Sequence, residues 1–189
     1  MALFNDPGRV PERPSFCHTK NHYMRVKTAF LSLFALLLAG ISYAQPSHPN
    51  SPHDTVRTKD ITVTYGRPYK KGREIFGKLE PYGKVYRLGA DEATTITFAR
   101  DATFGGKPVK AGTYTLFAIP NEKEWTIILN SQLGQWGAFK YDQYKDKDVL
   151  HVDVPVKTLS APVEQLTIAV SKKDLTISWD LTEVAVPLK

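Results

Sequence analysis

Residues 113–129, TYTLFAIPNEKEWTIIL, decide the fold class of this chain. The run 113–119 is apolar on both of its alternating faces, which is typical of a strand covered on both sides in the middle of a sheet. A turn that begins at Pro120 leads into the run 125–129, which is rich in β-branched and aromatic residues. We therefore predict a hairpin of two central strands.

Short runs of strand character continue on both sides of this hairpin. The run 61–65, ITVTY, alternates apolar and polar residues, so its odd-numbered side chains share one face. Gly105 and Gly106 can supply the positive φ angles of a two-residue hairpin turn. Further strands are predicted at residues 94–98, 149–154, 165–170 and 175–179, with a terminal edge strand at 183–186 before Pro187.

These signals predict an all-β fold. No segment longer than about ten residues keeps an apolar period of 3.6 residues, so we predict no helix beyond one turn near 74–76. The expected architecture is a single β-sandwich domain of about eight or nine strands over residues 57–189, with a closed barrel as the alternative. Two long loops rich in aromatic residues interrupt the strands, at 66–87 and 130–148.

The first 44 residues have the features of an export signal. Arg25 and Lys27 precede the apolar run 29–41, and SYA at 42–44 places small residues ahead of a cleavage site before Gln45. The apolar run is shorter than the roughly 20 residues that a transmembrane helix needs. We therefore interpret 24–44 as a cleavable signal peptide, with a short membrane anchor as the alternative reading.

The segments on either side of the signal peptide complete the expected organisation. Residues 1–23 carry scattered charges and prolines without periodicity, and we interpret them as an over-extended start before Met24 or as a long n-region. Residues 45–56 are rich in proline, serine and histidine, which predicts a flexible spacer. We expect a periplasmic or secreted protein without a stable membrane span after cleavage.

Charge and cysteine content narrow the classes of partner. The chain has 25 Lys and Arg against 19 Asp and Glu, a net charge of +6. Residues 1–44 hold five of these cations and two of these anions, so cleavage leaves 25 − 5 = 20 against 19 − 2 = 17, a net charge of +3. A nucleic-acid partner is therefore not expected. The one cysteine, Cys17, precedes the cleavage site, which leaves a cysteine-free mature chain.

Polar and aromatic residues in and beside the two long loops are the candidates for ligand binding. Arginine offers a planar set of donors that suits carboxylates, phosphates and uronates, and loops over a rigid β-fold are a common place for binding sites. We expect Glu92 to orient Arg87 and aromatic rings to stack on a ligand. The candidate ligand-binding residues are Arg67, Tyr69, Arg73, Arg87, Asp91, Glu92 and Trp136.

Each candidate also has a purely structural interpretation. Arg87 with Asp91 or Glu92 could pin the loop through an ion pair, and Trp136 could anchor the second loop on the sheet. Asp91 or Glu92 could instead serve a glycosidase, but neighbours in an extended chain point to opposite sides, so the second carboxylate would have to come from elsewhere, such as Glu74 or Asp142.

Other catalytic and cofactor motifs are missing from the sequence. His151 is the only histidine beyond the spacer, and no nucleophile elbow, phosphate-binding loop or dinucleotide fingerprint is present. His48 and His53 lie in the predicted spacer, and too few ligands accompany them for a zinc site. No cofactor and no metal site are expected.

Several short motifs together resemble the family called domain of unknown function 2911. They are VTYGRP at 63–68, GREIFG at 72–77, GKVYR at 83–87, GADEAT at 89–94, AGTY at 111–114 and WG at 136–137. The resemblance covers nearly all of the chain after the signal peptide, with Tyr86 where tryptophan is common in the family. It implies an exported bacterial protein without an established activity, and it assigns no catalytic residues.

The sequence therefore predicts an exported, non-catalytic β-sandwich module that binds a ligand through its loops. A glycan or a fragment of the cell envelope is the expected ligand class. A glycan-directed hydrolase that uses Asp91 or Glu92 is one alternative. The other is a structural or assembly protein that binds another protein. Neither the ligand nor the oligomeric state follows from the sequence.

Overall fold

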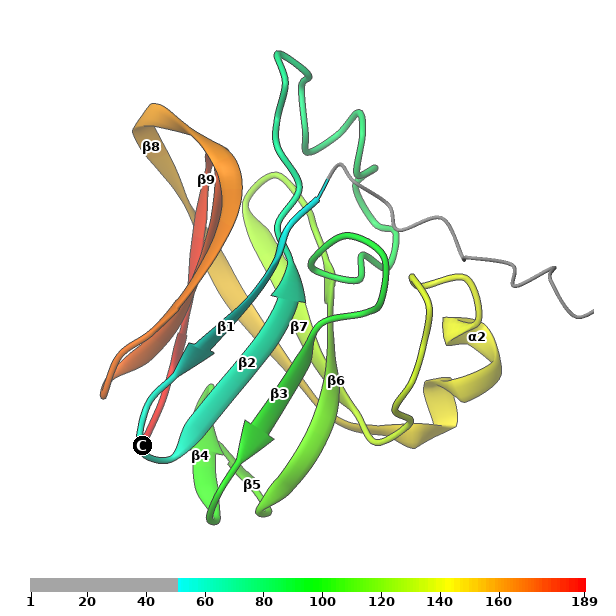
Figure 1. Ribbon diagram of the computed structural model, residues 1–189, viewed down its shortest axis with the longest axis vertical. Coiled ribbons are helices and arrows are strands. Elements are labelled where there is room, and N and C mark those ends of the chain that lie inside the picture. Colours follow the sequence, from blue (N-terminus) through cyan, green and yellow to red (C-terminus); the bar gives the residue numbers. More distant parts are fainter. Residues whose placement is uncertain (1–50) are drawn as a thin grey trace, which may run out of the picture. The chain divides into compact units, whose positions relative to one another are not determined.

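The computed structural model describes residues 51–189, so the predicted start, signal peptide and most of the spacer lie outside the described residues. Figure 1 shows the order of the elements along the chain. The elements are β1 (His53–Arg57), β2 (Ile61–Gly66), β3 (Thr95–Phe98), β4 (Ala102–Phe104), β5 (Lys107–Val109), β6 (Gly112–Ile119), β7 (Glu124–Asn130), α2 (Tyr141–Tyr144), a 3-10 turn (Lys145–Lys147), β8 (Asp148–Val170) and β9 (Asp174–Pro187).

Seven of these strands form one antiparallel sheet in the order β1-β2-β3-β6-β7-β8-β9. The predicted central hairpin is confirmed, because β6 and β7 pair with Leu116 opposite Leu129. Its buried run agrees with a position between other strands on both edges. The predicted Gly105–Gly106 turn is also confirmed, and it joins β4 to β5 in a separate two-stranded sheet.

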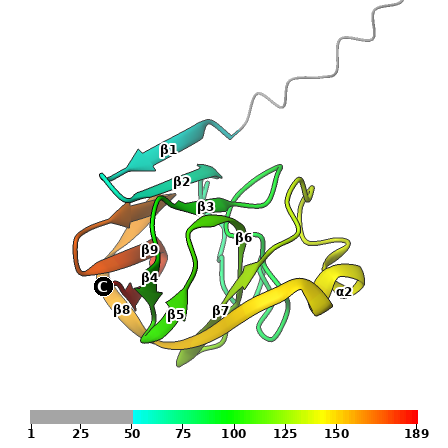
Figure 2. The same cartoon turned by 90° about the horizontal axis from the view of Figure 1, so that it is seen from below.

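Strand β8 curls the sheet. Its first part pairs with β7, and from Val156 onward it pairs with β9, with register shifts between Thr158 and Thr167. The two strands predicted at 149–154 and 165–170 are therefore parts of one long element. Figures 1 and 2 show β8 and β9 turning away from the plane of β6 and β7, so that they face β1 and β2 across the interior.

The curl brings β8 alongside the segment that follows β2. Lys70 N donates to Glu164 O at 2.6 Å, and Leu166 N donates to Pro68 O at 3.0 Å. The expectation of an all-β fold is confirmed, and its form is a curled sheet, an open half-barrel. At the other end of the interior, the β4–β5 hairpin bonds to the C-terminal residues: Thr103 N donates to Lys189 O at 2.6 Å, and Gly105 N donates to Pro187 O at 2.8 Å.

The interior is a continuous apolar core. Residues that alternate along the strands meet there, and Val63, Ile96, Leu116 and Ile127 are fully buried. Burying one such aliphatic side chain stabilises the fold by about 1.5–3 kcal/mol. A smaller group of Ala93, Phe117, Ile128 and Tyr141 packs on the outer side of the sheet, where α2 covers it.

Two expectations need correction. His53–Arg57 forms strand β1, so the predicted spacer is wrong from His53 onward; the backbone pairs with β2, and Val56 packs against the core. The second long loop contains α2 and the 3-10 turn, which were not predicted because elements this short show no periodicity. Within residues 51–189, no helix has the length and apolar character required to cross a membrane.

Candidate functional site

The first long loop closes one end of the curled sheet. It leaves β2 at Gly66 and crosses the end of the interior before returning to β3 (Figure 1). Phe76 anchors it, because its ring lies 4.6 Å from that of Trp125 and 6.1 Å from that of Trp179, measured between centroids. Such edge-to-face aromatic contacts stabilise a fold beyond the area that they bury.

The returning arm of this loop packs directly on Gly66. A side chain at Gly66 would collide with the backbone carbonyl of Ala90, so only glycine permits the approach. Two backbone hydrogen bonds attach the same arm to β6: Tyr86 N donates to Ala118 O at 2.7 Å, and Ala118 N donates to Tyr86 O at 2.9 Å. The backbone on both sides of Arg87 is therefore fixed before any ligand binds.

A cavity of about 510 Å³ lies between this loop and Trp179 of β9. Four of the seven predicted binding residues line it, namely Tyr69, Arg73, Arg87 and Asp91. Its other lining residues are Ser51, Pro68, Lys71, Leu79, Glu80, Gly89, Ala90 and Trp179. Its volume falls in the range of small-molecule binding sites.

Arg87 lines the cavity without a polar partner for its side chain. Its Nε is buried and has no hydrogen-bond partner among residues 51–189. The expectation that Glu92 orients Arg87 is wrong, since the Glu92 carboxylate bonds to His53 Nε2 at 3.2 Å instead. Within the described residues, the Arg87 side chain makes no ion pair at all.

Glu80 is the cavity residue that sequence reasoning missed. Burial raises the pKa of its carboxyl to about 7, although the nearby Arg87 and Arg73 guanidinium groups oppose the rise. Its backbone is held in a turn, with Glu80 N donating to Ile75 O at 2.9 Å. Among residues 51–189 its carboxyl has no hydrogen-bond or ion-pair partner. No signal in the sequence could have found it, since the flanking Leu79 and Pro81 are themselves exposed.

Trp179 forms the buried wall of the cavity. Its side chain is 1% exposed, and its Nε1 has no hydrogen-bond partner in the described part of the chain. Tyr86 stacks on it with a centroid separation of 6.4 Å, and the Tyr86 hydroxyl likewise has no partner there. Such buried polar atoms are rare in folded proteins, and each one needs an explanation.

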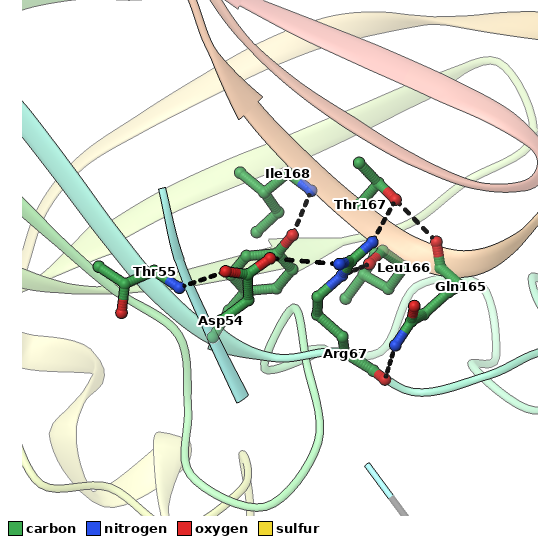
Figure 3. A network of polar contacts seen from close by, with 8 residues as sticks. Asp54, Thr55, Arg67, Gln165, Leu166, Thr167 and Ile168 are labelled. Carbon is green, nitrogen blue, oxygen red and sulfur yellow. Dashed lines mark hydrogen bonds and ion pairs between the residues drawn. The ribbon is translucent and has the colours of Figure 1, made fainter. Parts of the chain in front are cut away.

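Arg67 lies outside the cavity lining and joins distant strands instead. Figure 3 shows its guanidinium between β1 and β8. Nε donates to Leu166 O at 3.1 Å, Nη1 lies 3.2 Å from Asp54 Oδ2, and Nη2 donates to Thr167 Oγ1 at 3.2 Å. These contacts occupy all three guanidinium nitrogens. Arg67 therefore stabilises the contact between the end of β2 and β8, which we call the seam.

Arg73 and Tyr69 form the outer wall of the cavity. Arg73 donates from Nε to Lys70 O at 2.9 Å and from Nη2 to Tyr69 O at 2.5 Å, which folds its side chain back on the loop. Tyr69 is 37% exposed, so an aromatic face is accessible beside the arginine. Lys70 Nζ donates to Arg73 O at 2.7 Å and forms a largely buried ion pair with Asp180 at 3.1 Å.

Asp91 and Glu92 approach the same histidine instead of pointing to opposite sides, as neighbours in an extended chain would. Asp91 has a φ of 64° and lines the cavity. Glu92 is exposed and bonds to His53, whose Nε2 is also 4.0 Å from Asp91 Oδ2. In residues 51–189 no group of three or more histidine, cysteine, aspartate or glutamate side chains could hold a metal ion.

Trp136 lies in a separate hollow of about 280 Å³ on the second long loop. It is 50% exposed there, beside Leu133 and Phe139, and Phe139 is 81% exposed. The backbone of this loop joins the first loop, since Gly137 N donates to Asp91 O at 3.0 Å. The structure thus separates Trp136 from the cavity while linking the two loops through residues 91 and 92.

Comparison with known proteins gives a family and nothing more specific. No curated protein and no solved structure matches the chain. Residues 47–188 match a family described as "Protein of unknown function (DUF2911)", which covers the whole described domain apart from its last residue. The motifs quoted above, including the Gly66 that permits the close approach of Ala90, lie within that match. The chain is therefore a member of the DUF2911 family.

Proposed function

We propose that this protein is a binding module for a small, hydroxyl-rich ligand of the sugar class, held in the cavity beside Arg87. The observation that carries the proposal is a pair of opposite charges, Arg87 and Glu80, that line one cavity without bonding to each other or to any other residue in 51–189. Two such groups normally pair when they are partly buried.

The chemistry of the unpartnered groups favours hydroxyl groups. The Arg87 guanidinium group is a donor and needs acceptors, whereas an ionised Glu80 carboxylate needs donors. A hydroxyl group donates and accepts, so a ring that carries several hydroxyls can satisfy both residues. Tyr69, which is 37% exposed, adds aromatic surface for the apolar face of a sugar ring.

We also propose that the module acts outside the cytoplasm. The support is the predicted signal peptide at 24–44, with its basic n-region and the small residues before Gln45. Fragments of cell-envelope glycans are then the ligands within reach of a periplasmic or secreted protein.

A binding screen with matched variants tests the proposal. We expect neutral and acidic mono- and disaccharides to be detected by thermal shift and by NMR of the tryptophan indole NH groups. A sugar at about one hundred times its dissociation constant adds about 2.7 kcal/mol to stability, which is several degrees for a domain of this size. Arg87→Ala should abolish the shift while remaining folded, and Arg100→Ala, an exposed arginine outside this cavity, should retain it.

The indole signals separate this site from other surfaces. Binding in the cavity should move the Trp179 NH resonance, which Trp179→Phe identifies by its loss. A sugar that moves only the Trp136 resonance, with Arg87→Ala unaffected, would place the binding site in the other hollow and refute the proposal.

Hydrolysis of glycosides is a second candidate, favoured by the two carboxyl groups in the cavity. Glu80, with its pKa near 7, is suited to donate a proton near neutral pH, and Asp91 could act as its partner. Release of reducing ends from labelled oligosaccharides should then be lost in both Glu80→Gln and Asp91→Asn and retained in Glu92→Gln. Binding without any release of reducing ends would reject the hydrolase and retain the binding module.

A further inference from the structure

The charges that line the cavity do not balance. Three cationic side chains contribute, Lys71, Arg73 and Arg87, against the two carboxyl groups of Glu80 and Asp91. The nearby Lys70 and Asp180 neutralise each other at 3.1 Å and add nothing to the balance. Protonation of Glu80 would leave a single anion, Asp91, whose carboxylate lies within 4.0 Å of His53 Nε2.

We propose that the ligand is an acidic sugar, that its carboxylate binds between Arg87 and Glu80, and that Glu80 takes up a proton when it binds. This inference rests on the proposed sugar-binding function and narrows its ligand class. The guanidinium group of Arg87 supplies a planar donor set that fits a carboxylate. The protonated Glu80 then donates its hydroxyl hydrogen to a ligand oxygen instead of repelling it.

The surroundings of Glu80 make this proton uptake easy. Arg87 and Arg73 are the cations that act on it, Lys71 and Asp91 line the same cavity, and the Tyr86 hydroxyl lies on the buried side. Burial has already raised the pKa of Glu80 to about 7 despite the two arginines. An anionic ligand that occupies Arg87 removes part of the cation's effect and adds a like charge, and both changes raise the pKa further.

Thermodynamic linkage gives the sign and the size of the effect. A site that binds a proton together with its ligand binds more tightly as the pH falls, until the free site is itself protonated. For a free pKa near 7 that the ligand raises beyond this pH range, the affinity should rise by about tenfold and no more between pH 8 and pH 6. A neutral sugar of the same ring structure should show no such dependence.

Calorimetry of the full domain with D-glucuronate, D-galacturonate and methyl glucoside tests the inference. Titrations at pH 6, 7 and 8, each in two buffers of different ionisation enthalpy, count the protons that are taken up. We expect uptake of nearly one proton per uronate at pH 8 and about a tenfold gain in affinity by pH 6. Glu80→Gln should bind uronate with an affinity that does not vary with pH, and Glu74→Gln, an exposed carboxylate of the same loop, should behave as the native chain does.

The outcomes separate this inference from the function on which it rests. Uronate binding that is independent of pH, or methyl glucoside binding as tightly as the uronates, would overturn the inference and leave the sugar-binding module intact. Uronate binding whose pH dependence persists unchanged in Glu80→Gln would assign the proton to another group and would also overturn it. If neither sugar class binds at any pH, the proposed function itself fails.

Discussion

At the scale of single residues, Glu80 should make the stability of the domain depend on pH. Its pKa rises from 4.5 to about 7 on folding, so the folded state holds a proton that the unfolded state has lost between these two values. The contribution of Glu80 to the free energy of unfolding is therefore fully present below about pH 4.5. About 3 kcal/mol of that free energy is lost as the pH rises past 7. Urea unfolding curves at pH 5 and pH 8 should show this fall.

The matched variants isolate the contribution of Glu80 from that of other groups. Glu80→Gln should remove most of the fall in stability between pH 5 and pH 8, because the amide does not titrate. Glu74→Gln, which lies outside the cavity, should preserve it. An unchanged fall in Glu80→Gln would show that the carboxyl titrates near its ordinary pKa.

Arg67 should matter for stability and not for ligand affinity. Its guanidinium bonds to Leu166 O, Asp54 and Thr167, with the first and last of these about 100 positions along the chain. Arg67→Ala should cost about 2 kcal/mol in urea unfolding, because hydrogen bonds to charged groups are among the stronger ones. Arg100→Ala removes an exposed ion pair with Asp60 and should cost less than about 1 kcal/mol. If Arg67→Ala kept its full stability but lost sugar affinity, this prediction would be wrong and Arg67 would be part of the binding site.

At the scale of elements, the first long loop depends on the packing of Phe76. The ring lies among Tyr86, Trp125 and Trp179, and Phe→Ala in such a core costs about 3–5 kcal/mol. Tyr82→Ala in the same loop, where the side chain is 40% exposed, should cost less than about 1 kcal/mol. Urea unfolding measures both, and hydrogen exchange of the amides of residues 67–94 should accelerate in Phe76→Ala alone. Equal costs for the two variants would show that the loop is held by its backbone.

The elements that the sequence predicts well are those whose signal is local. Alternation in 61–65 and the buried run 113–119 depend on neighbours a few residues away, and both strands form. Strand β1 was missed because HDTVR is mostly polar, and its pairing comes from β2. The junction of two predicted strands into β8 was missed because Pro162 and the polar residues near it resemble a loop.

In the candidate site too, the residues with a local signal were predicted and those that depend on distant contacts were missed. Residue type alone selected Arg87, Arg73, Tyr69 and Asp91, and the fold brings these four to one cavity. Glu80 was missed because its significance comes from burial and from the charges of Arg87 and Arg73, which no local pattern encodes. The partner of Glu92 was wrong because His53 was placed in a spacer instead of a strand.

At the scale of the whole molecule, the predicted processing of the N-terminus can be measured directly. Expression of residues 1–189 with a C-terminal tag in a bacterial host with two membranes should yield a protein that begins at Gln45 and fractionates outside the cytoplasm. Intact mass and N-terminal sequencing check the cleavage site. Ala44→Arg places a large charged residue next to the cleavage site and should block processing, whereas Ala35→Leu within the apolar run should not. An uncleaved chain in the cytoplasm would contradict the export proposal.

The seam between β2 and β8 has a consequence for when the protein can fold. Tyr65 OH accepts from Ile168 N and Arg67 donates to Leu166 O, contacts that span 103 and 99 positions of the chain. Domains dominated by contacts so distant in sequence fold slowly, because the chain must close a long loop before the contact stabilises it. The half-barrel therefore cannot close until Ile168 has been synthesised. For most of its synthesis the nascent chain lacks its complete fold, so it can still pass through a narrow pore as an extended chain.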